Sequence, residues 1–205
     1  MVGPNRPQIV LFGSSIVQFS YSHEGWGSIL TDLYSCKADI VLRGYGGWNT
    51  RLALQVLDQI FPKSLSEKTR ILVLSTPPVN EEQIIKLFGS SRRSNESSHI
   101  YSEACIKMCK ELGIKVIDLW TALQNRDDWL TAHFTDGVHL TAEASKVVVK
   151  EILKVVKEAD WEPNLHWKSL PNEFAQYSPT IFVGPNGNTP VIVADLDLDW
   201  QAQWI

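Results

Sequence analysis

The stretch that decides the fold lies near the start of the chain and reads Gln8-Ile9-Val10-Leu11-Phe12-Gly13-Ser14-Ser15. A short apolar run that ends at a glycine is typical of a buried strand. In an open parallel sheet, ligands bind beyond the carboxyl ends of the strands. The serines that follow this strand are therefore expected beside a crevice, where a hydroxyl group can meet a ligand. The alternative is structural, because serine is also a common helix N-cap.

Apolar runs and amphipathic segments alternate through most of the chain. Further strands are predicted at 38–42, 70–74 and 115–118, and helices at 26–34 and 51–61. A polar loop is predicted from Gly89 to Ser98, and Thr141 is expected to cap a last helix. Another helix ends at Gly113, and its predicted buried stripe comprises Tyr101, Ala104, Cys105, Met108 and Leu112. This alternation favours an α/β fold with a parallel sheet and helices on both faces.

The character of the sequence changes after residue 160. We expect residues 1–160 to form the α/β domain and residues 161–205 to form a tryptophan-rich extension that packs on it. Near the end, apolar and polar residues alternate from Ala194 to Trp204, which predicts a strand with one apolar face. Its three aspartates do not match a calcium loop, because the loop glycine and the distal glutamate are missing.

Charge and composition exclude some classes of protein. The 205 residues carry a formal net charge of −4, which argues against a nucleic-acid binder, because such proteins need a basic face. No apolar run approaches the length of a membrane span. Cys36, Cys105 and Cys109 cannot all pair, and the apolar run near the start is too short for a signal peptide. We therefore expect a reduced protein of the cytoplasm; its oligomeric state is not indicated.

A second motif, Asp136-Gly137-Val138-His139, stands just before the last predicted helix. A histidine can remove a proton from a hydroxyl group and return it later, because its ordinary pKa lies near neutrality. Asp136, three residues earlier, could fix the imidazole tautomer and stabilise the imidazolium. The alternative is a turn followed by a buried, hydrogen-bonded histidine. Because both motifs lie at strand-to-helix junctions, Ser15, Asp136 and His139 are expected on one rim of the sheet.

A third motif, Arg43-Gly44-Tyr45-Gly46-Gly47-Trp48-Asn49-Thr50, follows the second predicted strand. Glycines in such a turn permit unusual backbone angles, and a free N–H group could point at a developing oxyanion. The alternative is a tight turn without a chemical role. The glycines do not supply the Gly-x-Gly-x-x-Gly turn of a nucleotide-binding module. Nor does the chain have the Gly-x-Ser-x-Gly of α/β-hydrolases, because Val17 replaces the second glycine.

Together these motifs resemble the SGNH, or GDSL, esterases, and especially the plant members of their isoamyl-acetate-hydrolysing branch. The resemblance covers roughly residues 8–172. It rests on 9–13 before the serine, Gly25-Trp26-Gly27, 42–45 with 47–51, 57–62, 76–82, and Phe134-Thr135-Asp136-Gly137-Val138-His139-Leu140.

The resemblance implies a flavodoxin-like SGNH hydrolase domain and a carboxylic-ester hydrolase that acts through an acyl-enzyme. Ser15 would be the nucleophile, His139 the general base and Asp136 its orienting partner. The oxyanion would be bound by the backbone N–H groups of Ser15 and Gly47. The implied partner is a small or lipid-like ester, without metal or organic cofactor, nucleic acid or membrane span.

One part of the family pattern is absent. The family places a Gly-x-Asn-Asp segment after the next strand, and its asparagine is a further oxyanion donor. Here the chain passes from Phe61-Pro62-Lys63 almost directly to the strand at 70–74. We therefore expect one strand-helix unit to be missing beside the first strand, unless the next strand slides into its place and brings Asn80 near the oxyanion. The alternative function is a shortened, catalytically impaired isoform or pseudoenzyme.

Overall fold

A computed structural model describes residues 6–61, 68–90, 93–175 and 203–204. Its strands form two parallel pairs: β1 (Gln8–Gly13) with β2 (Asp39–Gly44), and β3 (Leu72–Leu74) with β4 (Lys115–Ile117). The longer helices are α2 (Trp26–Leu33), α3 (Thr50–Ile60), α4 (Glu81–Phe88), α5 (Asn95–Glu111) and α8 (Ala142–Glu158). Short helices are α1 (Ser15–Gln18), α6 (Leu119–Ala122) and α7 (Trp129–Ala132). The predicted α/β class is confirmed.

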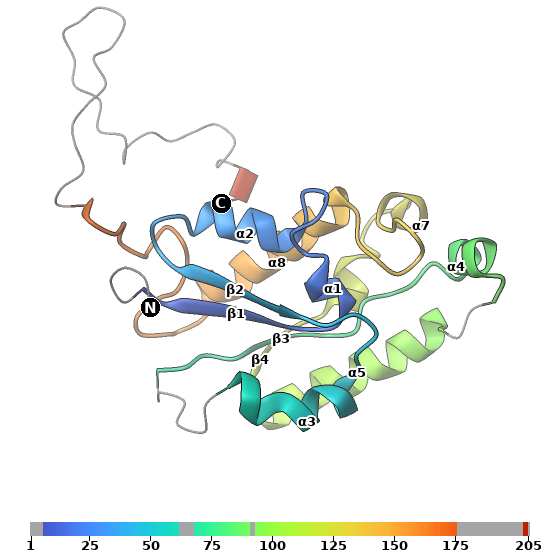
Figure 1. The fold of residues 1–205 in the computed structure, drawn as a ribbon, viewed down its shortest axis with the longest axis horizontal. Helices are drawn as coiled ribbons and strands as arrows, with labels where there is room; N and C mark the ends of the chain where they lie inside the picture. The colour runs from blue at the N-terminus through green and yellow to red at the C-terminus, as the bar shows by residue number, and fades with distance from the viewer. Residues whose placement is uncertain (1–5, 62–67, 91–92, 176–202, 205) are drawn as a thin grey trace, which may run out of the picture.

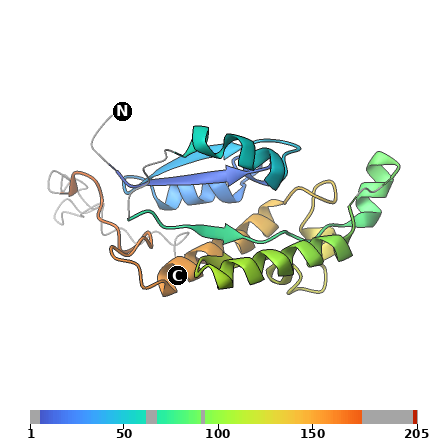
Figure 2. The ribbon, with the colours of Figure 1, turned by 90° about the horizontal axis from the view of Figure 1, so that it is seen from below.

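Helices cover the strands on two sides. Figure 1 shows α2 and α8 above the strands, and Figure 2 shows α3 and α5 on opposite sides of them. The core between α2, α8 and the strands is apolar, and its fully buried members include Leu30, Leu33, Val148 and Val149. Thr141 caps α8 as predicted, since its Oγ1 accepts a hydrogen bond from the N–H of Ala144 at 3.2 Å.

The two strand pairs do not join into one sheet. Figure 2 shows the β1 and β2 layer beside β3. No ladder joins β1 to β3 within the described ranges, because β1 pairs with β2 and β3 pairs with β4. The alternative in which the next strand slides into the place beside the first is therefore wrong. β3 instead pairs with β4 over three residues, in the register Leu72↔Lys115.

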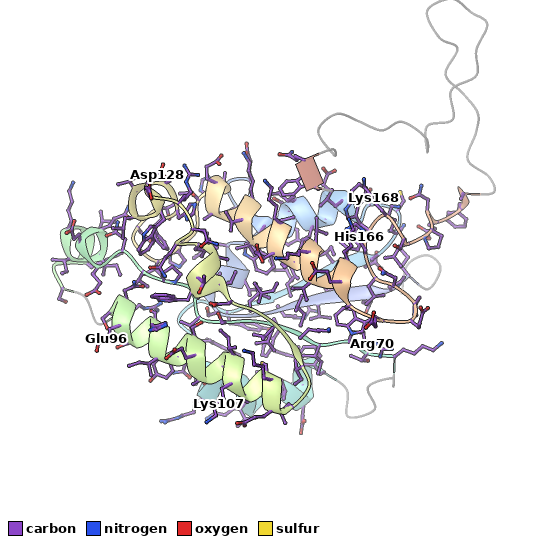
Figure 3. The ribbon with its side chains drawn as sticks, turned by 180° about the vertical axis from the view of Figure 1, so that it is seen from behind. Arg70, Glu96, Lys107, Asp128, His166 and Lys168 are labelled. Atoms are coloured by element: carbon purple, nitrogen blue, oxygen red, sulfur yellow. The ribbon has the colours of Figure 1, made fainter. Side chains whose placement is uncertain are left out.

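The chain after α8 returns along the core. Trp167 and Leu170 are buried in the same apolar cluster as α2 and α8, and Trp204 joins them. Tyr34 Oη donates a hydrogen bond to the backbone carbonyl of Leu165 at 2.9 Å. Arg70 reaches the same segment and donates to the carbonyl of Glu162 at 3.3 Å (Figure 3). The predicted strand from Ala194 to Trp204 lies outside the described residues except at its end, and the domain division stays a prediction.

The buried face of α5 differs from the prediction. Tyr101 and Leu112 of the predicted stripe are 69% and 63% exposed, whereas Ser98, Ser102 and Cys109 are buried. A polar contact fixes this orientation: Ser102 Oγ donates to Ser75 Oγ at 2.7 Å, and Ser75 Oγ also accepts the N–H of Leu119 at 3.0 Å. Because buried hydroxyls need partners, this link turns the small residues of α5 inward and its apolar stripe outward.

Helix α4 and the start of α5 were missed by the sequence analysis. α4 is capped by Asn80, whose Oδ1 accepts from the N–H of Gln83 at 3.0 Å, and ends at Gly89 with a left-handed φ of 76°. Ser94 caps α5 by accepting from the N–H of Ser97 at 3.1 Å. The loop predicted from Gly89 to Ser98 is therefore shorter than expected, because local capping begins the helix at Asn95.

The end of β2 approaches α1 so closely that Gly44 has no room for a side chain. A Cβ atom at this position would lie 2.0 Å from the backbone nitrogen of Gln18. We expect Gly44→Ala to lower the free energy of unfolding by about 3 kcal/mol, since backbone must move to admit the methyl group. Gly113→Ala is the control: its positive φ costs about 1 kcal/mol, but no atom lies within 4 Å of the added Cβ. Equal losses in urea denaturation would contradict this account.

Candidate active site

Asp136 and His139 form a compact pair on the loop before α8. His139 Nδ1 lies 2.6 Å from Asp136 Oδ2. Asp136 Oδ1 accepts hydrogen bonds from the backbone N–H groups of Val138 at 3.0 Å and His139 at 2.8 Å. His139 thus contacts the carboxylate through both its backbone N–H group and Nδ1, which fixes the loop around Asp136. The other ring nitrogen, Nε2, points away from the carboxylate.

These contacts hold Asp136 in its charged form. Partial burial acts to raise the pKa of its carboxyl group, but hydrogen bonds from the backbone and imidazole of His139 and from the N–H of Val138 outweigh burial. The pKa of Asp136 therefore lies below its usual value. A carboxylate that stays ionised can hold the imidazole in one tautomer and stabilise the imidazolium.

The loop is shaped by Gly137 and anchored to α4. Gly137 has a φ of 90°, and a Cβ here would lie 2.6 Å from the carbonyl oxygen of Asn80. The N–H of Asn80 donates to the carbonyl of Gly137 at 2.9 Å. Asn80 Oδ1 caps α4, and its Nδ2 donates to the carbonyl of Leu130 at 2.7 Å. The suggestion that Asn80 replaces the missing oxyanion donor is therefore wrong: its amide is committed elsewhere, and it holds the loop in place.

Ser15 is the first residue of α1 and stands at the carboxyl end of β1. Ser14 occupies the N-cap position, and its side chain makes no capping hydrogen bond. The structural alternative, in which Ser15 is the helix cap, is therefore wrong, because Ser14 holds that position. Ser15 is 9% exposed and lines a cavity, so its limited exposed surface faces a space where a ligand can bind.

All four predicted site residues meet at one cavity of about 510 Å³. A volume of this size suits a small-molecule ligand. His139 Nε2 is buried and has no hydrogen-bond partner among the residues that the structure describes. Ser15 and His139 thus share the cavity without a hydrogen bond between them, an arrangement that catalytic pairs without ligand often adopt. The cavity lining comprises Ser15, Phe19, Gly46, Gly47, Ile84, Phe88, Ser90, Arg93, Asp136, Val138 and His139.

The glycine turn after β2 brings Gly47 to the cavity. Gly47 lines the cavity in a left-handed conformation with a φ of 76°, and a Cβ atom there would meet nothing within 4 Å. The neighbouring N–H of Gly46 is already used, because it donates to Gln18 Oε1 at 2.5 Å. Gly47 is therefore the residue of this turn whose amide suits the oxyanion role.

Seven lining residues were not among the predicted site residues, although one of them, Gly46, stands in the predicted glycine turn. Phe19 packs edge-on against the His139 ring, with ring centroids 5.0 Å apart, and helps to fix the imidazole. Ile84 and Phe88 come from α4, which the sequence analysis missed. Ser90 and Arg93 come from the segment between α4 and α5, where the polar composition gave no signal of a site. Val138 stands within the predicted Asp-x-x-His motif.

The lowered pKa of Asp136 predicts an acid-sensitive part of the stability. A carboxyl group whose pKa is lower in the folded state stabilises the fold above its unfolded pKa, and this contribution is lost as the pH falls through the folded value. We expect Asp136→Asn to flatten the fall in the free energy of unfolding below about pH 4, measured by urea denaturation. Asp127→Asn, at an exposed carboxylate, is the control. Curves for wild type and Asp136→Asn that stay parallel would contradict it.

Within the described ranges, no helix is both long and apolar enough to cross a membrane. In the same part of the chain, no group of three or more His, Cys, Asp and Glu residues is placed to hold a metal ion. Cys36, Cys105 and Cys109 are free thiols.

The chain is similar in sequence to several known proteins. The chain is 46% identical to GDSL esterase/lipase WDL1 from Oryza sativa subsp. japonica, over 98% of this chain and 97% of the rice protein. It is 44% identical to GDSL esterase/lipase CPRD49 from Arabidopsis thaliana, over 100% of both chains. A more distant relative is the isoamyl acetate-hydrolyzing esterase 1 homolog of Rattus norvegicus, 28% identical over 66% of this chain and 75% of that protein.

The fold has a counterpart among solved structures. A crystal structure of a member of the lipolytic protein G-D-S-L family from Veillonella parvula superposes with a TM-score of 0.58, at 16% identity, over 74% of this chain and 99% of that one. No protein-family model matches the chain. Identity over nearly the full length of two plant proteins is nevertheless decisive: this chain belongs to the GDSL esterase/lipase family of ester-hydrolysing enzymes.

Proposed function

We propose that this protein hydrolyses carboxylic esters with Ser15, His139 and Asp136 as its catalytic triad. The observation that carries the proposal is the single cavity lined by Ser15, Gly47 and the hydrogen-bonded Asp136–His139 pair. A serine beside a histidine that is oriented by a carboxylate has the parts of an activated nucleophile.

The reaction proceeds in two halves. Ser15 Oγ forms a bond to the ester carbonyl carbon while His139 Nε2 takes the hydroxyl proton. The N–H groups of Ser15 and Gly47 stabilise the oxyanion. His139 then gives the proton to the leaving alcohol oxygen as the carbon–oxygen bond breaks. Water repeats the sequence on the acyl-enzyme: His139 takes its proton and returns it to Ser15 Oγ, and the carboxylic acid leaves.

The substrate class is a small or lipid-like ester, which would give the protein a place in lipid metabolism. Phe19, Ile84, Phe88 and Val138 give the cavity apolar walls suited to an acyl chain. The acidic net charge supports no nucleic-acid partner. Location in the cytoplasm is part of the same proposal and rests on the sequence alone.

A series of 4-nitrophenyl esters with increasing acyl length tests the activity. We expect hydrolysis above the buffer rate, with an acyl-enzyme that hydroxylamine intercepts as a hydroxamate. Hydrolysis that continues at the same rate after Ser15→Ala would contradict the proposed nucleophile.

A second candidate is a shortened, catalytically impaired relative of these esterases. It is favoured by the separation of the strands into two pairs, which leaves β1 and β3 unpaired with each other. It is also supported by the length of the alignment with the rice protein: that alignment spans 252 positions, more than the 205 residues of this chain. The rice protein thus has residues for which this chain has no counterpart.

Exposed apolar side chains on α3 and α5 favour the same candidate. Leu54 on α3 is 72% exposed, and Tyr101, Met108 and Leu112 of the predicted buried stripe of α5 are exposed as well. An additional helix would cover such surfaces, as a strand-helix unit inserted between α3 and β3 would. Loss of one oxyanion donor costs about 10²–10³-fold in turnover.

Thermal unfolding separates the two candidates. An active esterase requires a cooperative melt and little binding of a dye that reports exposed apolar surface. Broad unfolding with strong dye binding at room temperature, and no ester hydrolysis, would favour the impaired relative.

A further inference from the structure

The cavity carries a cationic side chain that the proposed reaction does not use. Arg93 and Ser90, from the segment between α4 and α5, line it together with Ser15 and His139. We propose that Arg93 binds a carboxylate at the non-reacting end of the substrate, so that the preferred ester is anionic. This inference rests on the proposed function and names the substrate class of the same site.

The charges around the cavity leave this role to Arg93. Besides Arg93, the ionisable groups in the lining are Asp136 and His139. The Asp136 carboxylate accepts hydrogen bonds from two backbone N–H groups and contacts the imidazole of His139. Its negative charge is therefore largely compensated and repels an anionic ligand only weakly. The other lining side chains are apolar or hydroxyl groups. An anionic ester would therefore find Arg93 as its complement.

Arg93 has the chemistry that this role needs. A guanidinium presents five N–H donors in a planar fork that matches a carboxylate. Arg93 already interacts within the chain, and five donors allow one such interaction and a ligand together. Ser90 adds a hydroxyl that can donate to the same carboxylate.

The walls between the two ends suit such a substrate. Phe19, Ile84 and Phe88 lie among the lining residues, so a methylene chain can run along them while the ester carbonyl meets Ser15. The cavity thus combines an apolar wall with one positive group. Such a cavity favours an acyl chain that ends in a carboxylate over one that ends in a methyl group.

The test compares two esters of equal carbon number: mono-4-nitrophenyl adipate, which carries a carboxylate, and 4-nitrophenyl hexanoate, which is neutral. We expect Arg93→Gln to lower kcat/KM for the adipate about tenfold, as loss of a charge-assisted hydrogen bond does. The hexanoate should change less than twofold. Arg93→Lys should retain part of the preference, because it keeps the charge and loses the planar fork.

The matched control is Lys86→Gln on α4. It removes the same charge from a helix that contributes to the cavity wall, but Lys86 is not a lining residue. We expect it to change neither ester more than twofold. Equal losses of kcat/KM for the adipate in Arg93→Gln and Lys86→Gln would assign the effect to the overall electrostatic field of the protein. That result would overturn the inference. An Arg93→Gln loss that is equal for both esters would overturn it as well.

A binding experiment keeps the inference separate from catalysis. The mono-4-nitroanilide of adipic acid has the same carboxylate and an amide in place of the ester, and its binding can be measured by calorimetry. If the protein hydrolyses neither ester, the proposed function fails, but the carboxylate-binding role of Arg93 is still supported if Arg93→Gln weakens binding of this anilide about tenfold. Wild-type binding no tighter than that of neutral hexanoyl 4-nitroanilide would overturn it.

Discussion

Ser15→Ala is expected to lower kcat for 4-nitrophenyl ester hydrolysis by about 10³-fold or more, because it removes the atom that bonds to the substrate. Ser15 is small and lies at the first position of α1, one residue after the N-cap, so alanine should fit without a change in fold. The measurement is a steady-state rate for each variant, together with a thermal melt.

Ser14→Ala is the matched control for this variant. It removes a hydroxyl group one residue away, at an N-cap position whose side chain makes no capping bond. We expect its kcat to stay within a few-fold of wild type. If Ser14→Ala abolished hydrolysis and Ser15→Ala did not, the nucleophile would have been assigned to the wrong serine.

His139→Ala is expected to have the second large effect, also about 10³-fold or more in kcat, because His139 is the one histidine among the described lining residues and the Asp136 carboxylate is bonded to the imidazole and to two backbone N–H groups. The variant leaves a space beside Phe19 and Asp136, where free imidazole can enter. We expect added imidazole to restore part of the activity in His139→Ala and none in Ser15→Ala.

His99→Ala controls for a general effect of losing a histidine. His99 stacks on Trp120 at a centroid distance of 4.1 Å and takes no part in the cavity lining. Its kcat should stay within a few-fold of wild type. Full activity of His139→Ala would count against a role of His139 as the base. So would a His139→Ala protein that melts cooperatively but is inactive and is not rescued by imidazole.

The sequence predicted the elements whose signals are local. The apolar run before Gly13, the left-handed Gly113 after α5 and the cap at Thr141 are each set by a few neighbouring residues, and the structure has all three. The Asp136–His139 contact was predictable for the same reason, since three residues on one loop bring the two side chains within reach.

The features that the sequence did not predict depend on distant contacts. The inward face of α5 is set by Ser75, which lies 27 residues away from its partner Ser102, so an apolar stripe alone pointed to the wrong face. Asn80 looked like a possible oxyanion donor, but its amide is taken by α4 and Leu130. Arg93 could not be singled out, because only the folded chain brings it to the cavity that Ser15 lines.

The separation of β1 from β3 bears most directly on activity. β1 and β3 do not pair with each other, and the cavity that Ser15 and Gly47 line is completed by Ile84, Phe88, Ser90 and Arg93. Whether Ser15 is activated therefore decides between the esterase and its impaired relative.

The most direct test of that claim is intact-mass spectrometry after reaction with a fluorophosphonate probe, followed by peptide mapping. These probes modify serine only when a folded site activates it, so a heat-denatured sample is the control. We expect one adduct, on Ser15, that is absent from the denatured protein and from His139→Ala. A folded protein that forms no adduct, or forms it on another serine, would contradict the proposed active site.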